Sequence, residues 1–248
     1  MLQEIRIIKH NGKQFIPDLR KAVVPYPFRG RPEISSVKVD EKELIHICPT
    51  KAISSNPISI DLGKCTFCGA CAFSFPQKIS FTNDHRLATN KRDRLLIREG
   101  VDSTISLDQD NINKGINKLF GKSLKLRQVS AGGDNSCELE LNACGNANFD
   151  MGRYGIEFVA SPRHADGIVI TGPVSENMAE ALQICYESIP DPKIVILCGV
   201  DAISGGIFKD SKAVNRKYTE SLKVDLYIPG NPPHPLTIIN GILDLIGK

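Results

Sequence analysis

The chain has 248 residues, of which 41% are hydrophobic and 24% charged, and its formal net charge is +3. This composition is ordinary for a soluble globular protein and leaves room for one large domain or two modest ones. The net charge is too small to argue for nucleic-acid binding, and the absence of Trp together with 6% aromatic residues argues against a base-stacking platform. No run approaches the roughly 20 apolar residues of a membrane span, and the first residues lack a signal-peptide core, so we expect a cytoplasmic chain.

Residues 1–34 are basic and rich in proline. The stretch RKAVVPYPFRGRPE contains three prolines, which disfavour a helix because proline lacks the backbone donor and restricts its neighbour. We therefore expect an extended basic arm over residues 1–34.

Residues 35–104 carry the first group of cysteines and then a charged segment. Short β-type runs at 58–62 and 79–82 flank the cysteines, and residues 84–104 have the composition of a linker. We therefore predict a small α+β domain followed by a linker.

Residues 105–248 show the pattern of an α/β domain. Asp108 is a candidate helix cap, with Ile112, Ile116 and Leu119 on one helical face. Apolar, β-rich runs follow at residues 167–171, 193–198 and 224–228. A helical pattern capped by Ser175 lies between the first two runs, with an apolar face of Met178, Ala181, Leu182 and Cys185, and a second helical pattern ends the chain.

Apolar strands that alternate with helices predict a parallel sheet covered on both faces. Ligands of such sheets bind at the loops beyond the carboxyl ends of the strands. Here these loops are TGPVSEN, CGVDAISGG and PGNPPHP.

The segment KCTFCGACAFSFP has the cysteine spacing of an iron–sulfur ligand run. Cys65, Cys68 and Cys71 follow C-x2-C-x2-C, but Phe75 stands where a fourth cysteine would precede the proline. The missing cysteine is found 27 residues earlier, where the segment KVDEKELIHICPTKAI repeats the pattern and Cys48 precedes Pro49. In this repeat, Lys38, Glu41 and Leu44 stand in place of the other three cysteines.

This duplicated run resembles the two-cluster ferredoxins, in which the fourth cysteine of each half ligates the cluster of the other half. The resemblance implies one intact 4Fe–4S site made of Cys48, Cys65, Cys68 and Cys71. It also implies one erased site made of Lys38, Glu41, Leu44 and Phe75, with the two apolar residues filling the lost volume and the two charged residues facing solvent. Four thiolates also suit zinc, which stays open as an alternative.

The second half, from GGDNSCELELNACGNANFDMGRYGIEFVASPRHADGIVITGPVSENM to VDLYIPGNPPHP, resembles a known family. It is similar to the small subunit of energy-converting, membrane-bound NiFe hydrogenases such as formate hydrogenlyase and to the 20 kDa subunit of respiratory complex I. The first half, including PYPFRGRP, resembles the ferredoxin-like subunit of the same complexes. The resemblance implies a fusion of two neighbouring subunits, a ferredoxin-like domain at 35–104 followed by a flavodoxin-like α/β domain at 105–248.

In the family, the α/β subunit holds a 4Fe–4S cluster through four cysteines. The matching positions here are Asp134, Cys137, Asp201 and Asn231, three of which are not cysteine. A mostly oxygen ligand set does not suit such a cluster, so we expect this site to be lost. Three further cysteines follow patterns of core residues or lie apart from Cys137, namely Cys144, Cys185 and Cys198.

Other polar residues match the family without indicating catalysis. Glu140 matches an acidic residue beyond the ligand loop, and a carboxylate near a helix start is the plainer interpretation. Arg163 and His164 are interpreted as hydrogen-bonding loop residues, and His234 as a surface or turn residue.

The leading hypothesis is an electron-transfer subunit with one 4Fe–4S cluster and no catalytic residues of its own. Its α/β domain would dock a large hydrogenase-like or 49 kDa-like subunit, and partner subunits would place it peripherally on the inner membrane face. The alternative is a scaffold or assembly protein in which the cluster is structural or regulatory. The sequence predicts no nucleic-acid partner and no direct membrane span.

Overall fold

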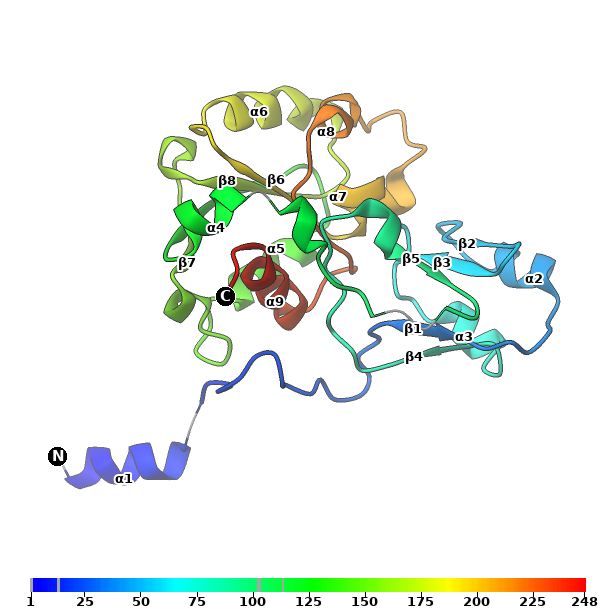
Figure 1. Cartoon of the computed structure of the whole chain (residues 1–248), viewed down its shortest axis with the longest axis horizontal. Helices are drawn as coiled ribbons and strands as arrows, with labels where there is room; N and C mark the ends of the chain where they lie inside the picture. Colours follow the sequence, from blue (N-terminus) through cyan, green and yellow to red (C-terminus); the bar gives the residue numbers. More distant parts are fainter. Residues whose placement is uncertain (1, 13, 102–103, 113) are drawn as a thin grey trace.

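The computed structural model describes residues 2–12, 14–101, 104–112 and 114–248 (Figure 1). A cysteine-rich part with small antiparallel sheets lies beside an α/β part built on one parallel sheet. The predicted succession of an α+β part and an α/β part with a parallel sheet is therefore found.

The α/β part is organised around a five-stranded parallel sheet with the order β10-β9-β8-β6-β7. Its strands are β6 (Leu124–Ser130), β7 (Ile156–Phe158), β8 (Gly167–Thr171), β9 (Ile194–Cys198) and β10 (Leu226–Ile228). Its helices are α4 (Lys114–Phe120), α5 (Ser136–Ala143), α6 (Glu176–Glu187), α7 (Val200–Ser204), α8 (Lys217–Ser221) and α9 (Pro235–Leu245). Because the strands are parallel, their carboxyl ends and the following loops lie at one edge.

The side chains on the two faces of the sheet pack into two different apolar cores. In β9, Ile194 and Ile196 pack in the core that contains α9, whereas Val195 and Leu197 pack in the core that contains Leu182 of α6. This alternation follows from the two-residue period of a strand. Figure 1 shows α6 and α8 on one side of the sheet and α5 and α9 on the other.

The cysteine-rich part contains short strands and two short helices. Strand β1 (Pro32–Ile34) pairs with β4 (Ile79–Phe81), and β3 (Ser59–Asp61) lies between β2 (Ile53–Ser54) and β5 (Leu96–Arg98), all antiparallel. The helices are α2 (Glu41–His46) and α3 (Ala70–Ser74). The buried side chains of this part join the same core as the α6 face of the sheet, so the two parts share apolar packing.

The segment predicted as an extended arm departs from that prediction at both ends. Residues Leu2–Asn11 form helix α1, none of whose side chains is buried, and β1 lies within the last residues of the segment. Residues 14–31 are irregular, as their prolines predict, and Leu19 is buried against the α/β part. The prolines explain the irregular stretch. Residues 2–11 contain no proline, so nothing there prevents a helix.

The charged segment 84–104 is not a linker. It contains the 3₁₀ turn Arg92–Leu95 and strand β5, and the side chains of Leu95 and Ile97 are buried. Thr89 pairs with Tyr227 of β10 through two backbone hydrogen bonds of 3.0 and 2.8 Å. The prediction was wrong because it rested on the many charged residues of the segment, whereas its apolar residues Leu95 and Ile97 belong to the core.

The predicted strands and helices of the α/β part are found with small shifts of their bounds. Helix α6 buries Leu182 and half-buries Met178 and Cys185, but Ala181 is exposed. Asp108 caps the 3₁₀ turn Gln109–Asn111 rather than a long helix, and Leu119 of α4 is exposed. No helix within the described residues is long and apolar enough to cross a membrane.

Candidate functional site

Four cysteines line one small cavity, which we call the thiol cavity. They are the four residues of the predicted cluster site, Cys48, Cys65, Cys68 and Cys71. The cavity also has apolar walls, including Ile53, Ile60 and Phe81. The structure therefore brings together residues that lie in two separate halves of the duplicated run.

Local structure explains how each loop reaches the cavity. Asp40 caps α2 by accepting hydrogen bonds from two backbone N–H groups, and Cys48 follows the end of this short helix. Gly69 has φ +80°, a conformation that favours glycine, and allows the cysteine loop to turn into α3. Thus Cys48 comes from a helix end, and the other three thiols come from one tight loop.

Two thiols accept backbone hydrogen bonds. The N–H of Ala52 lies 3.2 Å from Cys48 Sγ, and the N–H of Phe67 lies 3.3 Å from Cys65 Sγ. Donors directed at sulfur stabilise thiolates and are one means by which proteins adjust the potential of iron–sulfur clusters. The donor set and its supporting N–H groups therefore fit a cluster.

Burial raises the pKa of Cys65 to about 12 and that of Cys71 to about 11, and the neighbouring thiols add to both shifts. These groups are therefore neutral thiols near neutral pH when no metal holds them. A metal ligand must be a thiolate, so loading of this site would release protons.

The thiol cavity has a volume of about 20 Å³, and no group of three or more potential ligands among the described residues is arranged around a single metal ion. Cys68 lies at the surface, so the thiol cavity borders on solvent at this residue.

An arginine of the segment expected to be a linker supports the cysteine loop. Arg92 donates two hydrogen bonds of 2.7 Å to the side-chain carboxylate of Asp61. The backbone carbonyl oxygen of Asp61 accepts a hydrogen bond from the N–H of Cys65. Sequence reasoning missed this contact because the two residues are far apart in the chain.

The four positions where the duplicated run lacks a cysteine have the exposures that we expected. Leu44 and Phe75 are buried in the core, whereas Lys38 and Glu41 are exposed. Apolar side chains therefore fill the core at two of the positions where the duplicated run lacks a cysteine.

In the α/β part, three of the four positions carried over from the family lie close enough to influence one another electrostatically. Burial raises the pKa of Cys137 to about 12, and the nearby carboxylates of Glu138, Asp201 and Asp134 add to the shift. Burial also raises the pKa of Asp201 to about 6, with Asp134 adding to the shift and Arg216 opposing it. This group of acids and one buried thiol lacks the soft ligands that an iron–sulfur cluster requires.

Asp134 is hydrogen-bonded within its own loop. It accepts from the N–H and the hydroxyl of Ser136 at 3.0 and 2.6 Å, and this holds the pKa of its carboxyl below the ordinary value. Arg216, which sequence reasoning did not single out, donates to the carbonyl oxygens of Asp201, Ala202 and Ile203. Its role depends on tertiary packing, so no local signal could have identified it.

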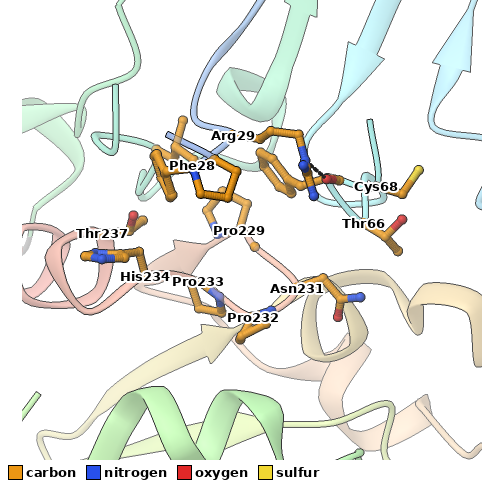
Figure 2. Close-up of a pocket in the computed structure, with 14 residues that line it drawn as sticks. Phe28, Arg29, Thr66, Cys68, Pro229, Asn231, Pro232, Pro233, His234 and Thr237 are labelled. Atoms are coloured by element: carbon orange, nitrogen blue, oxygen red, sulfur yellow. Dashed lines mark hydrogen bonds between the residues drawn. The ribbon is translucent and has the colours of Figure 1, made fainter. Parts of the chain in front are cut away.

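The fourth position, Asn231, faces a different space. It lines a cavity of about 230 Å³ between the cysteine loop and the loop at 229–234, which we call the loop cavity (Figure 2). Cys68 lines both the thiol cavity and the loop cavity. The cysteine site and Asn231 are therefore neighbours across this space.

The remaining polar and cysteine residues take structural positions. Cys144 and Cys198 are buried and Cys185 is half-buried, and burial raises the pKa of Cys144 and Cys198. Glu140 lies beyond the first turn of α5, and Arg163 and His164 are exposed. His234 is not a simple surface residue, because it caps α9 and its ring meets the rings of Phe28 and Phe149 edge-on.

Comparison with known proteins places the α/β part of this chain in a family. Residues 135–245 match the family model described as NADH ubiquinone oxidoreductase, 20 Kd subunit. The chain is 37% identical over 131 residues to a probable membrane-bound hydrogenase subunit mbhJ of Pyrococcus furiosus, covering 53% of this chain and 78% of that protein. It is 45% identical over 115 residues to an NADH-quinone oxidoreductase subunit of Geotalea daltonii, covering 45% of this chain and 67% of that protein.

The chain therefore belongs to the NADH ubiquinone oxidoreductase 20 kDa subunit family. A solved chain from the membrane-bound sulfane sulfur reductase, an archaeal respiratory membrane complex, is 33% identical with a TM-score of 0.47, covering 53% of this chain and 72% of that chain. The family match begins at residue 135, so it does not include the cysteine-rich part.

Proposed function

We propose that this chain is an electron-transfer subunit of a membrane-associated oxidoreductase assembly. In this proposal it carries one 4Fe–4S cluster, held by Cys48, Cys65, Cys68 and Cys71. The observation that supports it most directly is the convergence of these four thiols on one cavity. When bound, such a cluster supplies one-electron transfer and no bond-making chemistry.

The residues of this chain would hold and adjust that cluster. The four thiols would give up their protons on loading, and the N–H groups of Ala52 and Phe67 already point at the sulfur atoms of Cys48 and Cys65. Arg92 and Asp61 keep the start of the cysteine loop in place. The apolar walls shield Cys65 from water, while Cys68 lies at the surface.

The α/β part would dock a large subunit of the hydrogenase or 49 kDa type. Support comes from family membership and from the relatives, which are named as subunits of a membrane-bound hydrogenase and of NADH-quinone oxidoreductase. In this proposal residues 35–104 act as the cluster domain and residues 105–248 as the docking domain. The assembly, rather than a segment of this chain, would hold it at the membrane.

A scaffold or assembly protein is the second candidate. The observation that favours it is the acid and amide set at Asp134, Asp201 and Asn231, which removes a redox centre from the α/β part. Here the cluster would be structural or regulatory. Reversible reduction of the cluster and electron delivery to a partner separate an electron carrier from a scaffold.

The cluster itself is tested by anaerobic purification with iron and sulfide analysis. We expect about four irons and four sulfides per chain, whereas zinc with no iron would contradict the proposal. Cys48→Ser should abolish the visible and EPR signals, and Cys185→Ser serves as the matched control that leaves them unchanged. A normal spectrum in the Cys48→Ser protein would overturn the crossed ligation.

A further inference from the structure

The loop cavity contains a group that attracts an anion and no carboxylate that would repel one. Arg29 reaches its edge, and the residues that line it include no aspartate or glutamate. Its other polar side chains are those of Thr66, Cys68, Asn231, His234 and Thr237. A cavity with a guanidinium group and no carboxylate favours a negatively charged ligand.

Arg29 retains donors for such a ligand. Its Nε donates to the carbonyl oxygen of Phe67, and the terminal nitrogens have no protein partner within the described residues. Figure 2 shows this bond beside Cys68, on the side of the cavity opposite Asn231. The bond holds the guanidinium at the cavity while leaving its terminal N–H groups available.

A helix end strengthens the positive potential. Helix α9 begins at the cavity, where His234 is its N-cap, and it runs for 11 residues to Leu245. The N-terminal end of a helix carries partial positive charge. The ring nitrogen Nδ1 of His234 accepts from the N–H of Leu236 at 3.1 Å, so Nε2 of the neutral ring carries the proton.

The remaining walls are flat and apolar. They are formed by the ring of Phe28 and by prolines of the loop at 229–234 (Figure 2). The ring of Phe28 is also held edge-on by His234, with the centroids 5.5 Å apart. A flat ring can lie against such surfaces, whereas a small hydrated ion would leave them without contacts.

We propose that the loop cavity binds a small aromatic anion, with its acidic group at Arg29 and its ring between Phe28 and the prolines. The volume of about 230 Å³ lies below the roughly 300–1,000 Å³ of sites for drug-sized ligands, so the ligand has one ring rather than several. The site is built from protein groups alone, so it does not require the proposed cluster. If that cluster is present, the ligand lies beside its most exposed cysteine.

The test measures binding of phenyl phosphate to the full chain by isothermal titration calorimetry. We expect saturable binding at least about tenfold tighter than that of inorganic phosphate or phenol, because each of these probes satisfies only one half of the cavity. Equal affinity for phenyl phosphate and inorganic phosphate would overturn the aromatic half of the proposal. Absence of phenyl phosphate binding up to roughly 10 mM would overturn it entirely.

Three variants locate the site. Arg29→Gln and Asn231→Asp should each weaken phenyl phosphate binding at least about tenfold, the first by removing a donor and the second by adding a negative charge. Arg163→Gln changes the charge equally at an exposed residue outside the cavity and should leave the affinity within about twofold. Because Asn231 lies on the opposite wall, its variant remains informative if Arg29→Gln fails to fold. Unchanged affinity in both cavity variants would overturn the assignment.

Iron analysis of the same samples separates this inference from the proposed function. A chain without iron that still binds phenyl phosphate would contradict the cluster and leave the loop cavity assignment standing. An Arg29→Gln protein that keeps about four irons but loses the probe would assign Arg29 to the ligand rather than to the cysteine loop.

Discussion

Burial raises the free-energy cost of ionising Asp201. Its ordinary pKa of 3.8 rises to about 6 in the folded chain, first because of burial and then because of Asp134. The unfolded chain therefore loses this proton at lower pH than the folded chain does. The free energy of unfolding therefore falls as the pH rises from about 3.8 through about 6. Above that range it remains at the lower value.

We predict that Asp201→Asn raises the melting temperature at about pH 8 and gives little or no gain at about pH 4. Calorimetric melting at both pH values measures the effect, with Asp210→Asn at an exposed position as the charge-matched control. An equal gain at both pH values would show that ionisation of Asp201 is not the cause.

Leu44 is a core residue at one of the positions where the duplicated run lacks a cysteine. Its side chain is fully buried, so Leu44→Ala should lower the free energy of unfolding by about 2–5 kcal/mol through lost burial and cavity formation. Lys38→Ala, at the exposed neighbouring ligand position, should change it by less than about 0.5 kcal/mol. Urea denaturation tests both, and similar values for the two variants would refute this assignment of the core.

For single residues, the sequence predicts which positions face the core better than it predicts the hydrogen bonds that hold the site in place. The burial of Leu44 and Phe75 was predicted and is confirmed, because a repeat defines which positions face inward. Arg29, Arg92 and Arg216 could not be identified, because each acts on backbone or side chains distant in the chain.

The N-terminal elements differ in how much packing they provide. Helix α1 has no buried side chain, whereas Leu19, a few residues later, is 1% exposed. An isolated helix of ten residues gains little stability by itself, so α1 contributes little to the fold.

Deletion of residues 1–11 should therefore change the melting temperature by less than about 1 °C. Leu19→Ala should lower the free energy of unfolding by about 2–5 kcal/mol, because the buried side chain leaves a cavity. Thermal melts of the two variants make the comparison. A large loss on deleting α1 would mean that the helix packs against the rest of the chain.

Among the elements, long apolar runs were predicted reliably and short ones were not. Strand β8 has the predicted bounds, since five successive buried residues permit little else. The prediction missed β6, whose alternating charged residues hide it, and β5, which lies within a charged segment. Composition alone cannot separate a linker from a strand when only alternate residues are buried.

The whole molecule is joined by apolar packing across its two parts. Residues of the cysteine-rich part and of the α6 face of the sheet belong to one buried cluster. This continuity could not be derived from the sequence, because hydrophobic periodicity identifies a buried face without identifying the surface that covers it.

We predict one cooperative thermal transition for the chain, with equal calorimetric and van't Hoff enthalpies. Leu87, which lies in the shared core and lines the loop cavity, is the position to perturb. Leu87→Asp should lower the melting temperature or separate the transition into two. Two resolved transitions in the unaltered protein would instead mean that its parts unfold independently.

The bridge between Thr89 and Tyr227 has a consequence for dividing the molecule. A cut after Val101 would leave Thr89 on one fragment and Tyr227 on the other. The two fragments could then pair through this bridge, as an added strand pairs with the edge of a sheet. Two polypeptides made from such a split gene should reassemble when they are co-expressed, and co-purification on a single affinity tag would reveal the pair. The covalent continuity of the chain would then not be required for its assembly.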